Sequence, residues 1–224
     1  MPQMRYYTQI QKRHLILRYC MCKLDFHFYK SSLLILTLGI ILYITGNFFI
    51  PLYNGLTVTL IEHVQSLFLL FMCGYTYYYA QRVAEHSQLY KFWIWTIFWW
   101  FMLFGRGISW GRDFFPDVPR FYYKIIASTL ISIPMLSMFL PTIRQEIARR
   151  YKFEQIPVWH IFLAFLFLGI ADIAEHHRMG HEFLVIAKER KDLIEELMEC
   201  PCLLCLALTT FYMQKNEQKK KENL

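Results

Sequence analysis

Carboxylates within or beside long apolar stretches are the residues of this chain with the clearest potential for chemistry. The candidates for a catalytic or proton-carrying role are Glu62, Asp172, Glu175 and Glu199. A charged side chain at membrane depth is costly and usually faces a protein interior or a water-filled cavity. Glu62 or Asp172 could act as a general base, or the carboxylates could together relay protons.

Helical spacing groups further polar residues around these carboxylates. Side chains at positions i, i+3 and i+4 share one face of a helix. Three stretches follow this spacing: Glu62, Gln65 and Ser66; Arg106, Ser109 and Trp110; and Asp172, Glu175 and His176. Glu195 and Glu199, four residues apart, form a fourth group. We expect one polar cavity shared by all four, because each lies near the same end of its predicted helix. The alternative is a set of ordinary interfacial residues that mark where the helices stop.

Two arginines, Arg106 and Arg112, accompany this set, together with Trp110 and Gln65. Arginine recognises phosphate and carboxylate groups through its planar guanidinium fork. One interpretation is that these residues bind the anionic head group of a lipid or other amphiphile. The other is that the arginines form ion pairs with the neighbouring acids, and the sequence leaves both open.

Histidines at the end of the apolar stretch at residues 158–175 suggest a metal site. His177 and His181 are four residues apart, a spacing that suits two ligands on one helical face, and His176 lies beside them. Imidazole together with carboxylate suits a divalent ion such as zinc. Gly180 weakens the helix between the pair, however, and histidines at helix ends are common in proteins without a metal.

Long apolar stretches must position these side chains. Of 224 residues, 56% are apolar and only 18% are charged, whereas soluble domains carry about 25% charged residues. A membrane-spanning helix needs about 20 predominantly apolar residues. Six stretches approach that length, at 32–53, 56–80, 92–108, 122–140, 158–175 and 193–213. We therefore predict an all-α, polytopic membrane bundle of six transmembrane helices, with a kink at Pro134.

The distribution of Lys and Arg predicts the orientation of this bundle. Cytoplasmic loops of membrane proteins carry an excess of these residues. With a cytoplasmic N-terminus, 16 of the 24 basic residues fall on the cytoplasmic side and 8 on the outer side. We predict that both termini are cytoplasmic. The chain then divides into a basic N-terminal segment (1–30), a transmembrane domain (31–214) and a charged tail (215–224) that we expect to be disordered.

The net charge of +7 could indicate a nucleic-acid ligand, but its distribution follows the membrane topology instead. The sequence contains no RNA-binding signature and no Gly-rich phosphate loop of the Walker type. We therefore expect the lipid bilayer as the partner, and no nucleic acid.

Several of these motifs together resemble a known group of proteins. They are Asn54-Gly55, Glu62-x-x-Gln65, Ser109-Trp110-Gly111-Arg112, Asp172-x-x-Glu175-His176 and Glu195-Glu196-x-x-Glu199. The set resembles bacterial multi-span inner-membrane proteins with a Ser-Trp-Gly-Arg motif near the outer end of a middle helix. The resemblance implies a multi-pass protein of the bacterial cytoplasmic membrane, and it implies no particular reaction.

A fainter similarity is to the alkaline ceramidase-like superfamily of membrane hydrolases. Those enzymes hold zinc with three histidines, beside a carboxylate and a serine, in a helical bundle. The similarity would give comparable parts to Glu62, Ser66, Asp172, His177 and His181. That superfamily usually has seven spans, whereas this chain has six predicted spans and no clear third histidine.

These patterns leave several functions open. The leading interpretation is a membrane protein that binds, or acts on, a lipid or amphiphile head group in a polar cavity at its outer side. A metal-dependent hydrolase is one alternative, in which a bound metal activates water. A small ion-coupled transporter and a membrane assembly partner are the others.

Overall fold

The chain folds almost entirely into helices, as the sequence predicts. The computed structural model describes residues 24–84, 87–112, 114–176 and 186–222. Its long helices are α2 (Lys30–Phe48), α3 (Leu56–Arg82), α4 (Ser87–Gly107), α5 (Arg120–Ser137), α6 (Pro141–Phe153), α7 (Val158–His176) and α8 (Lys191–Glu222). Short elements precede or connect these helices: β1 (Leu24–Asp25), η1 (Tyr53–Gly55), η2 (Ser109–Gly111), β2 (Ile156–Pro157) and η4 (Lys188–Arg190).

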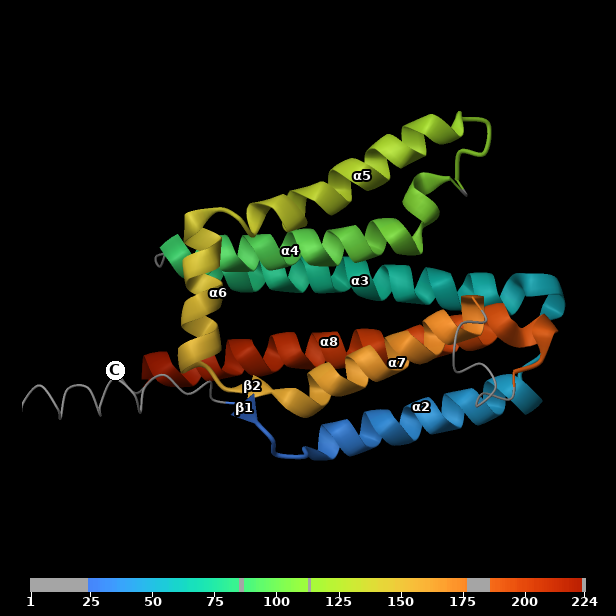
Figure 1. The fold of residues 1–224 in the computed structure, drawn as a ribbon, viewed down its shortest axis with the longest axis horizontal. Helices are drawn as coiled ribbons and strands as arrows, with labels where there is room; N and C mark the ends of the chain where they lie inside the picture. The colour runs from blue at the N-terminus through green and yellow to red at the C-terminus, as the bar shows by residue number, and fades with distance from the viewer. Residues whose placement is uncertain (1–23, 85–86, 113, 177–185, 223–224) are drawn as a thin grey trace, which may run out of the picture.

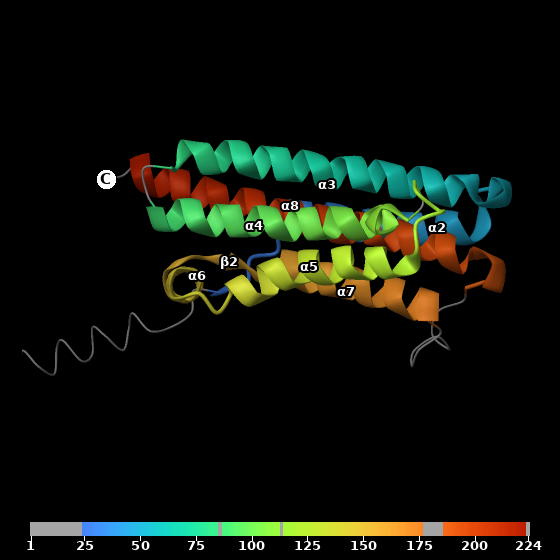
Figure 2. The ribbon, with the colours of Figure 1, turned by 90° about the horizontal axis from the view of Figure 1, so that it is seen from above.

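Six of these helices run alongside one another, and α6 lies across one end of the bundle (Figures 1 and 2). We call this the α6 end and the opposite one, which carries η1 and η2, the η2 end. A bend of 65° separates α5 from α6. It falls at Pro141, because a residue before proline, here Leu140, favours extended backbone. The helix continues through Pro134 to Ser137, so the main bend lies beyond the proline at which the sequence predicts a kink.

Length and composition make three segments able to cross a membrane: α2, η1 with α3, and α7. Counting α5 and α6 as one bent segment adds a fourth. The predicted stretches at α4 and α8 also form helices, but these helices are not among the candidate spans. Trp and Tyr make α4 less apolar, and four acids lie in the first part of α8. The described chain is therefore all-α with three or four candidate spans, and the number six stays a prediction.

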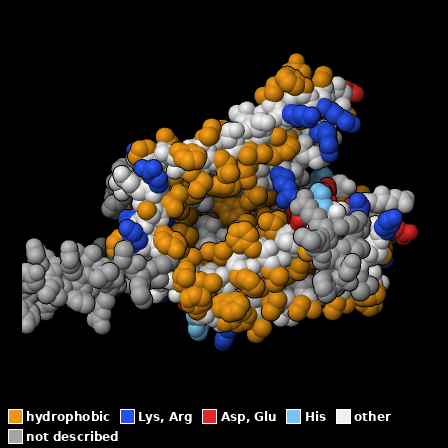
Figure 3. Space-filling view, viewed as in Figure 1, with side chains coloured by type: hydrophobic (Ala, Val, Ile, Leu, Met, Phe, Trp, Pro, Cys, Tyr) orange, Lys and Arg blue, Asp and Glu red, His pale blue; other side chains and the backbone are white. Residues whose placement is uncertain are grey.

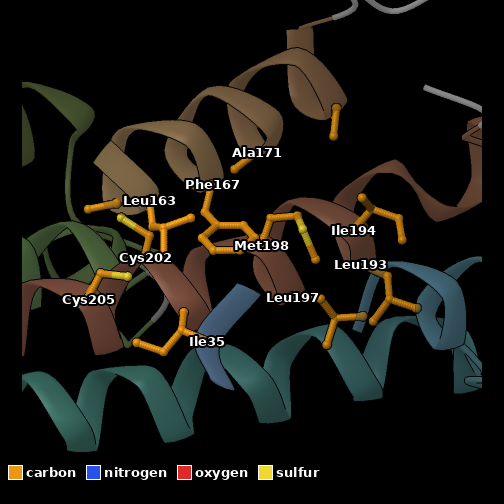
Figure 4. Close-up of a cluster of buried hydrophobic side chains, with 12 residues drawn as sticks. Ile35, Leu163, Phe167, Ala171, Leu193, Ile194, Leu197, Met198, Cys202 and Cys205 are labelled. Atoms are coloured by element: carbon orange, nitrogen blue, oxygen red, sulfur yellow. The ribbon is translucent and has the colours of Figure 1, made fainter. Parts of the chain in front are cut away.

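The largest core joins α2, α7 and α8 (Figure 4). Phe167 of α7 lies between Ile35 of α2 and Met198 of α8, and all three are buried. A side chain at Gly39 would place its Cβ 2.2 Å from the Phe167 ring, so glycine lets α2 approach α7 closely. Small residues at helix contacts are typical of membrane bundles.

Helix α8 also packs on the other half of the bundle. Leu69, Met72 and Cys73 of α3 form a second core with Trp100 of α4 and Leu203 of α8. Cys73, Cys202 and Cys205 are buried and form no disulfide among the described residues, so they pack as small apolar side chains. Because α8 continues to Glu222, the expectation of disorder is wrong for residues 215–222.

Candidate functional site

A groove opens between α4 and α7, with α8 as its floor. It contains a cavity of about 440 Å³ near the η2 end. The cavity is lined by Arg106 of α4; Phe165, Leu168, Gly169, Ala171, Asp172 and Glu175 of α7; and Glu195 and Glu199 of α8. Figure 3 shows a hollow in this face, surrounded mainly by apolar side chains and with charged ones at one end. The site therefore combines a polar end with an apolar wall.

An ion pair joins the α4 wall of the α4–α7 groove to its floor on α8. Arg106 Nη2 donates to Glu199 Oε1 over 2.6 Å. The Arg106 side chain is 51% exposed, whereas that of Glu199 is 15% exposed. The open side of the guanidinium keeps donors available to a ligand, because the fork carries five N–H groups. Of the two interpretations of Arg106, the structure shows the ion pair directly.

Three side chains of α7 cluster at the mouth of the groove. His176 Nδ1 lies 3.0 Å from Glu175 Oε2 and 3.5 Å from Asp172 Oδ1. All three side chains are more than 40% exposed. The predicted metal ligands His177 and His181 lie outside the described residues, so the zinc site remains a prediction. Within the described part of the chain, no three His, Cys, Asp or Glu side chains are grouped closely enough to hold a metal ion.

Acids outnumber bases in this groove. Four carboxylates line the cavity, and among its described lining residues Arg106 is the one Lys or Arg. Its guanidinium already pairs with Glu199. The other three acids of the cavity are Asp172, Glu175 and Glu195, and the carboxylates of Asp172 and Glu175 also contact His176. This composition suits a cationic group beside the carboxylates, whereas the arginines by themselves suggested an anionic head group from sequence.

Gln65 serves to connect helices. It is buried, and its Nε2 donates to the Glu196 carbonyl over 2.7 Å and to Cys200 Sγ over 3.5 Å. Both partners belong to α8, so the amide holds α3 against α8 beneath the groove. The helical spacing predicts that Gln65 faces the polar cavity, whereas its amide meets the backbone of α8 and the groove lining does not include it.

Glu62 lies in a different cavity from Arg106. It lines a space of about 460 Å³ between α3 and the α4–η2 segment, together with His63 and Ser66. The prediction of one shared polar cavity therefore needs revision: two cavities carry its members, and α4 contributes to both. Sequence spacing identifies residues on one helix face but cannot say which neighbouring helix that face meets.

The Ser-Trp-Gly-Arg segment forms a left-handed turn. Ser109, Trp110 and Gly111 have φ values of 49°, 58° and 91°. Such angles are strained for Ser and Trp but free of cost for Gly. The Trp110 ring covers Gly105, where a Cβ would lie 2.8 Å from it, so Trp110 packs α4 against the start of the next connection. Arg112 follows the turn, is exposed, and lines neither cavity.

The α6 end holds a buried charge network that the sequence analysis missed. Arg150 is 3% exposed, and its guanidinium contacts three carboxylates. Its Nε donates to Glu146 over 3.0 Å, Nη1 donates to Glu154 over 3.1 Å, and Nη2 contacts Glu217. Arg149 adds hydrogen bonds of 2.7 and 2.8 Å to Glu146. These contacts fasten α6 to the end of α8.

The same network includes aromatic groups of α3 and α4. Tyr79 donates to Glu217 Oε2 over 2.9 Å, and Trp93 Nε1 donates to the same oxygen over 3.1 Å. The Arg150 guanidinium lies 3.7 Å from the centre of the Phe92 ring, within cation–π range. The spacing of Glu146, Arg150 and Glu154 at i, i+4 and i+8 was a visible signal in the sequence. Their meeting with Glu217, in a tail expected to be disordered, was not.

A second polar cluster at the α6 end involves Asp25 of β1. Tyr29 and Tyr212 both donate to its carboxylate, Tyr212 over 2.7 Å. Burial opposes ionisation of Asp25, but these two hydrogen bonds outweigh it and lower the pKa below its usual value of 3.8. The cluster thus ties the strand that precedes α2 to α8.

Comparison of the chain with protein-family models, with curated proteins and with solved structures finds no match. The fold and the two cavities are therefore the basis on which its function is argued.

Proposed function

We propose that this chain is a membrane protein that binds the head group of a lipid or other amphiphile in the α4–α7 groove. The observation that carries the proposal is the composition of that groove. An apolar wall with Phe165 and Leu168 leads to a polar end with Arg106, Asp172 and Glu195. A ligand with a long hydrocarbon chain and a polar head has the same division.

The proposal includes six spans, with α6 and both termini on the cytoplasmic side. Six long helices run the length of the bundle, and the helix ends alternate between its two ends (Figure 1). The excess of Lys and Arg on the predicted cytoplasmic side supports this orientation. Many large apolar side chains are exposed along α3 and α7, as a surface in contact with lipid requires. The groove then opens toward the outer leaflet. From the resemblance noted above, we place the protein in the bacterial cytoplasmic membrane.

The four acids among the lining residues of the groove favour a head group that carries an amine. An ammonium can approach the carboxylates of Asp172, Glu175 and Glu195, while a neighbouring phosphate can approach the exposed side of Arg106. A zwitterionic phosphoethanolamine head satisfies both charges. A phosphoglycerol head carries no amine and would contact Arg106 alone.

Lipid retention tests this proposal. The protein is released from nanodiscs that contain equal amounts of phosphatidylethanolamine and phosphatidylglycerol, and bound lipids are counted by native mass spectrometry. We expect the wild type to retain phosphatidylethanolamine preferentially, and the double variant Asp172→Asn/Glu195→Gln to lose that preference.

Asp192→Asn is the matched control, since this acid of α8 is exposed and lies outside the cavity lining. Equal retention of the two lipids by the wild type would contradict the proposed head group. Loss of retention in Asp192→Asn as well would point to the general charge of this end of the protein instead.

The metal-dependent hydrolase keeps one favourable observation. His176 lies against two carboxylates, in the helix that leads into residues 177–185. Metal analysis of protein purified without chelators tests this candidate, with His177→Ala/His181→Ala as the variant. About one zinc per chain in the wild type, absent from the variant, would support it.

A further inference from the structure

The cavity between α3 and the α4–η2 segment is separate from the groove. Its polar side carries Glu62, His63 and Ser66 of α3, with Thr59 one turn earlier. The cavity holds about 460 Å³. That is room for a head group and several methylene units of a chain.

Ser66 is the most informative member of this cavity. The residue is 6% exposed, and its Oγ has no hydrogen-bond partner among the described residues. Serine hydroxyls inside helices usually bond to a carbonyl one turn earlier. A buried hydroxyl without a hydrogen-bond partner costs free energy. A ligand that offers this hydroxyl a partner therefore binds more tightly.

Gly107 of α4 leaves the space in front of this hydroxyl. A Cβ at Gly107 would lie 3.0 Å from Ser66 Oγ, closer than side chains normally approach each other. Any residue other than glycine would therefore press on the hydroxyl and narrow the cavity. The absence of a side chain at position 107 keeps Ser66 in contact with the cavity.

His63 supplies a hydrogen-bond acceptor. Its Nδ1 lies 2.7 Å from the carbonyl oxygen of Thr59. A carbonyl oxygen can only accept, so Nδ1 carries the proton in this contact. In the neutral ring Nε2 then has a free lone pair, which can accept from an O–H or N–H of a ligand.

The remaining lining is apolar. Leu67 and Leu70 of α3 face the cavity from one side, and Phe104, Ile108 and Phe114 from the other. Leu67 is 67% exposed on the outer surface of the bundle. A hydrocarbon chain can therefore enter from the surrounding lipid without crossing a polar barrier.

We propose that this cavity is a second amphiphile site, which binds a head group with neighbouring hydroxyls, as in a glycolipid or a monoacylglycerol. A hydroxyl both donates and accepts. Two adjacent hydroxyls can satisfy Ser66 Oγ and His63 Nε2 at once, and further ones can donate to the Glu62 carboxylate. A single carboxylate beside a serine and a histidine distinguishes this cavity from the α4–α7 groove, where four carboxylates favour an amine. The proposal does not depend on the function of the groove.

A photoactivatable octyl glucoside with a diazirine on its chain tests the site. The protein is held in amphipol, labelled below the critical micelle concentration, and digested for mass spectrometry. We expect labelling within residues 59–70 and 104–114, with competition by octyl glucoside. Octylammonium, which has the same chain and an amine head, should compete about tenfold less well.

Variants separate this site from general labelling of apolar surface. Ser66→Ala and Gly107→Ala should each reduce labelling about tenfold, a change that corresponds to losing one good hydrogen bond. Gly74→Ala on α3 is the control, since a Cβ there meets no atom within 4 Å. Ser66→Ala should also keep or raise the melting temperature without ligand, because it removes an unpartnered hydroxyl.

Three results would overturn the proposal. One is labelling spread over the apolar surface and unchanged in both variants. Another is competition by octylammonium at least as strong as by octyl glucoside. The third is a Ser66→Ala variant that labels like the wild type.

Discussion

The buried charge network around Arg150 at the α6 end and the α4–α7 groove both place charged side chains around α8. They differ in how far these side chains are buried and in the ratio of acids to bases. In the network, Arg150 and Glu146 are almost completely buried, and each carboxylate contacts an arginine. In the groove, the Arg106 side chain is half exposed, and four carboxylates share the described lining with this one arginine. The network is a closed set of contacts, whereas the groove is open and its described lining has more acids than bases.

This difference indicates what each set of charges does. A buried ion pair is held by its partners, and removing one partner leaves an uncompensated charge in the interior. An exposed ion pair contributes little to stability. The network therefore holds α6 on the bundle, and the openness of the groove agrees with the binding role proposed for it.

Loss of Arg150 should have the largest effect on stability. Arg150→Met leaves Glu146, Glu154 and Glu217 without their shared guanidinium, so we expect a loss of about 3–5 kcal/mol. Unfolding in mixed micelles measures it. Arg144→Met, at an exposed position of the same helix, is the control and should be nearly neutral. Equal losses of stability in Arg150→Met and Arg144→Met would contradict the claim that the buried network stabilises the protein more than exposed charges do.

A smaller loss should follow from Glu217→Gln. The amide oxygen can still accept from Tyr79 and Trp93, but it no longer offsets the charge of Arg150. We expect a destabilisation of roughly 1–3 kcal/mol in the same unfolding assay. A variant as stable as the wild type would show that the contact between Glu217 and Arg150 does not contribute to the free energy of unfolding.

The same substitution at the other end of α8 should hardly change stability. Glu199→Gln removes one member of a partly exposed ion pair, for which we expect a change below about 1 kcal/mol. Lipid retention should nevertheless fall, because Arg106 loses the partner that orients it. A change in stability as large as that of Glu217→Gln, with retention unaffected, would reverse the assignment of the two regions.

Acid should weaken the α6 end through Asp25. Its pKa is lowered in the folded protein, so its contribution to stability is present above the usual pKa of 3.8 and is lost as the pH falls through the folded value. Tyr212→Phe removes one donor and raises the folded pKa toward its usual value. We expect this variant to lose about 0.5–1.5 kcal/mol near neutral pH and to show a weaker pH dependence below about pH 4.

Unfolding measured from roughly pH 6 to 3 tests this expectation. Tyr122→Phe, at an exposed position of α5, is the control and should follow the wild type. An identical pH dependence for wild type and Tyr212→Phe would show that Asp25 does not contribute.

Much of the fold could be predicted from the sequence. The apolar stretches at 56–80 and 158–175 correspond closely to α3 and α7, because continuous apolar runs without proline determine where such helices begin and end. The grouping of Arg106, Asp172 and Glu199 at one end of the bundle was also predictable. It depends on position along each helix and on alternating helix direction.

The tertiary structure decided which of these side chains meet. Glu62 shares its predicted depth with Arg106 but turns toward another cavity, because the rotation of α3 is set by its packing on α8 through Leu69 and Gln65. Arg150 and Glu217 are far apart in the sequence, and they meet only because the bend at Pro141 turns α6 across the bundle. Helix periodicity is a local property of the chain, whereas helix rotation and crossing depend on all the neighbours that a helix packs against.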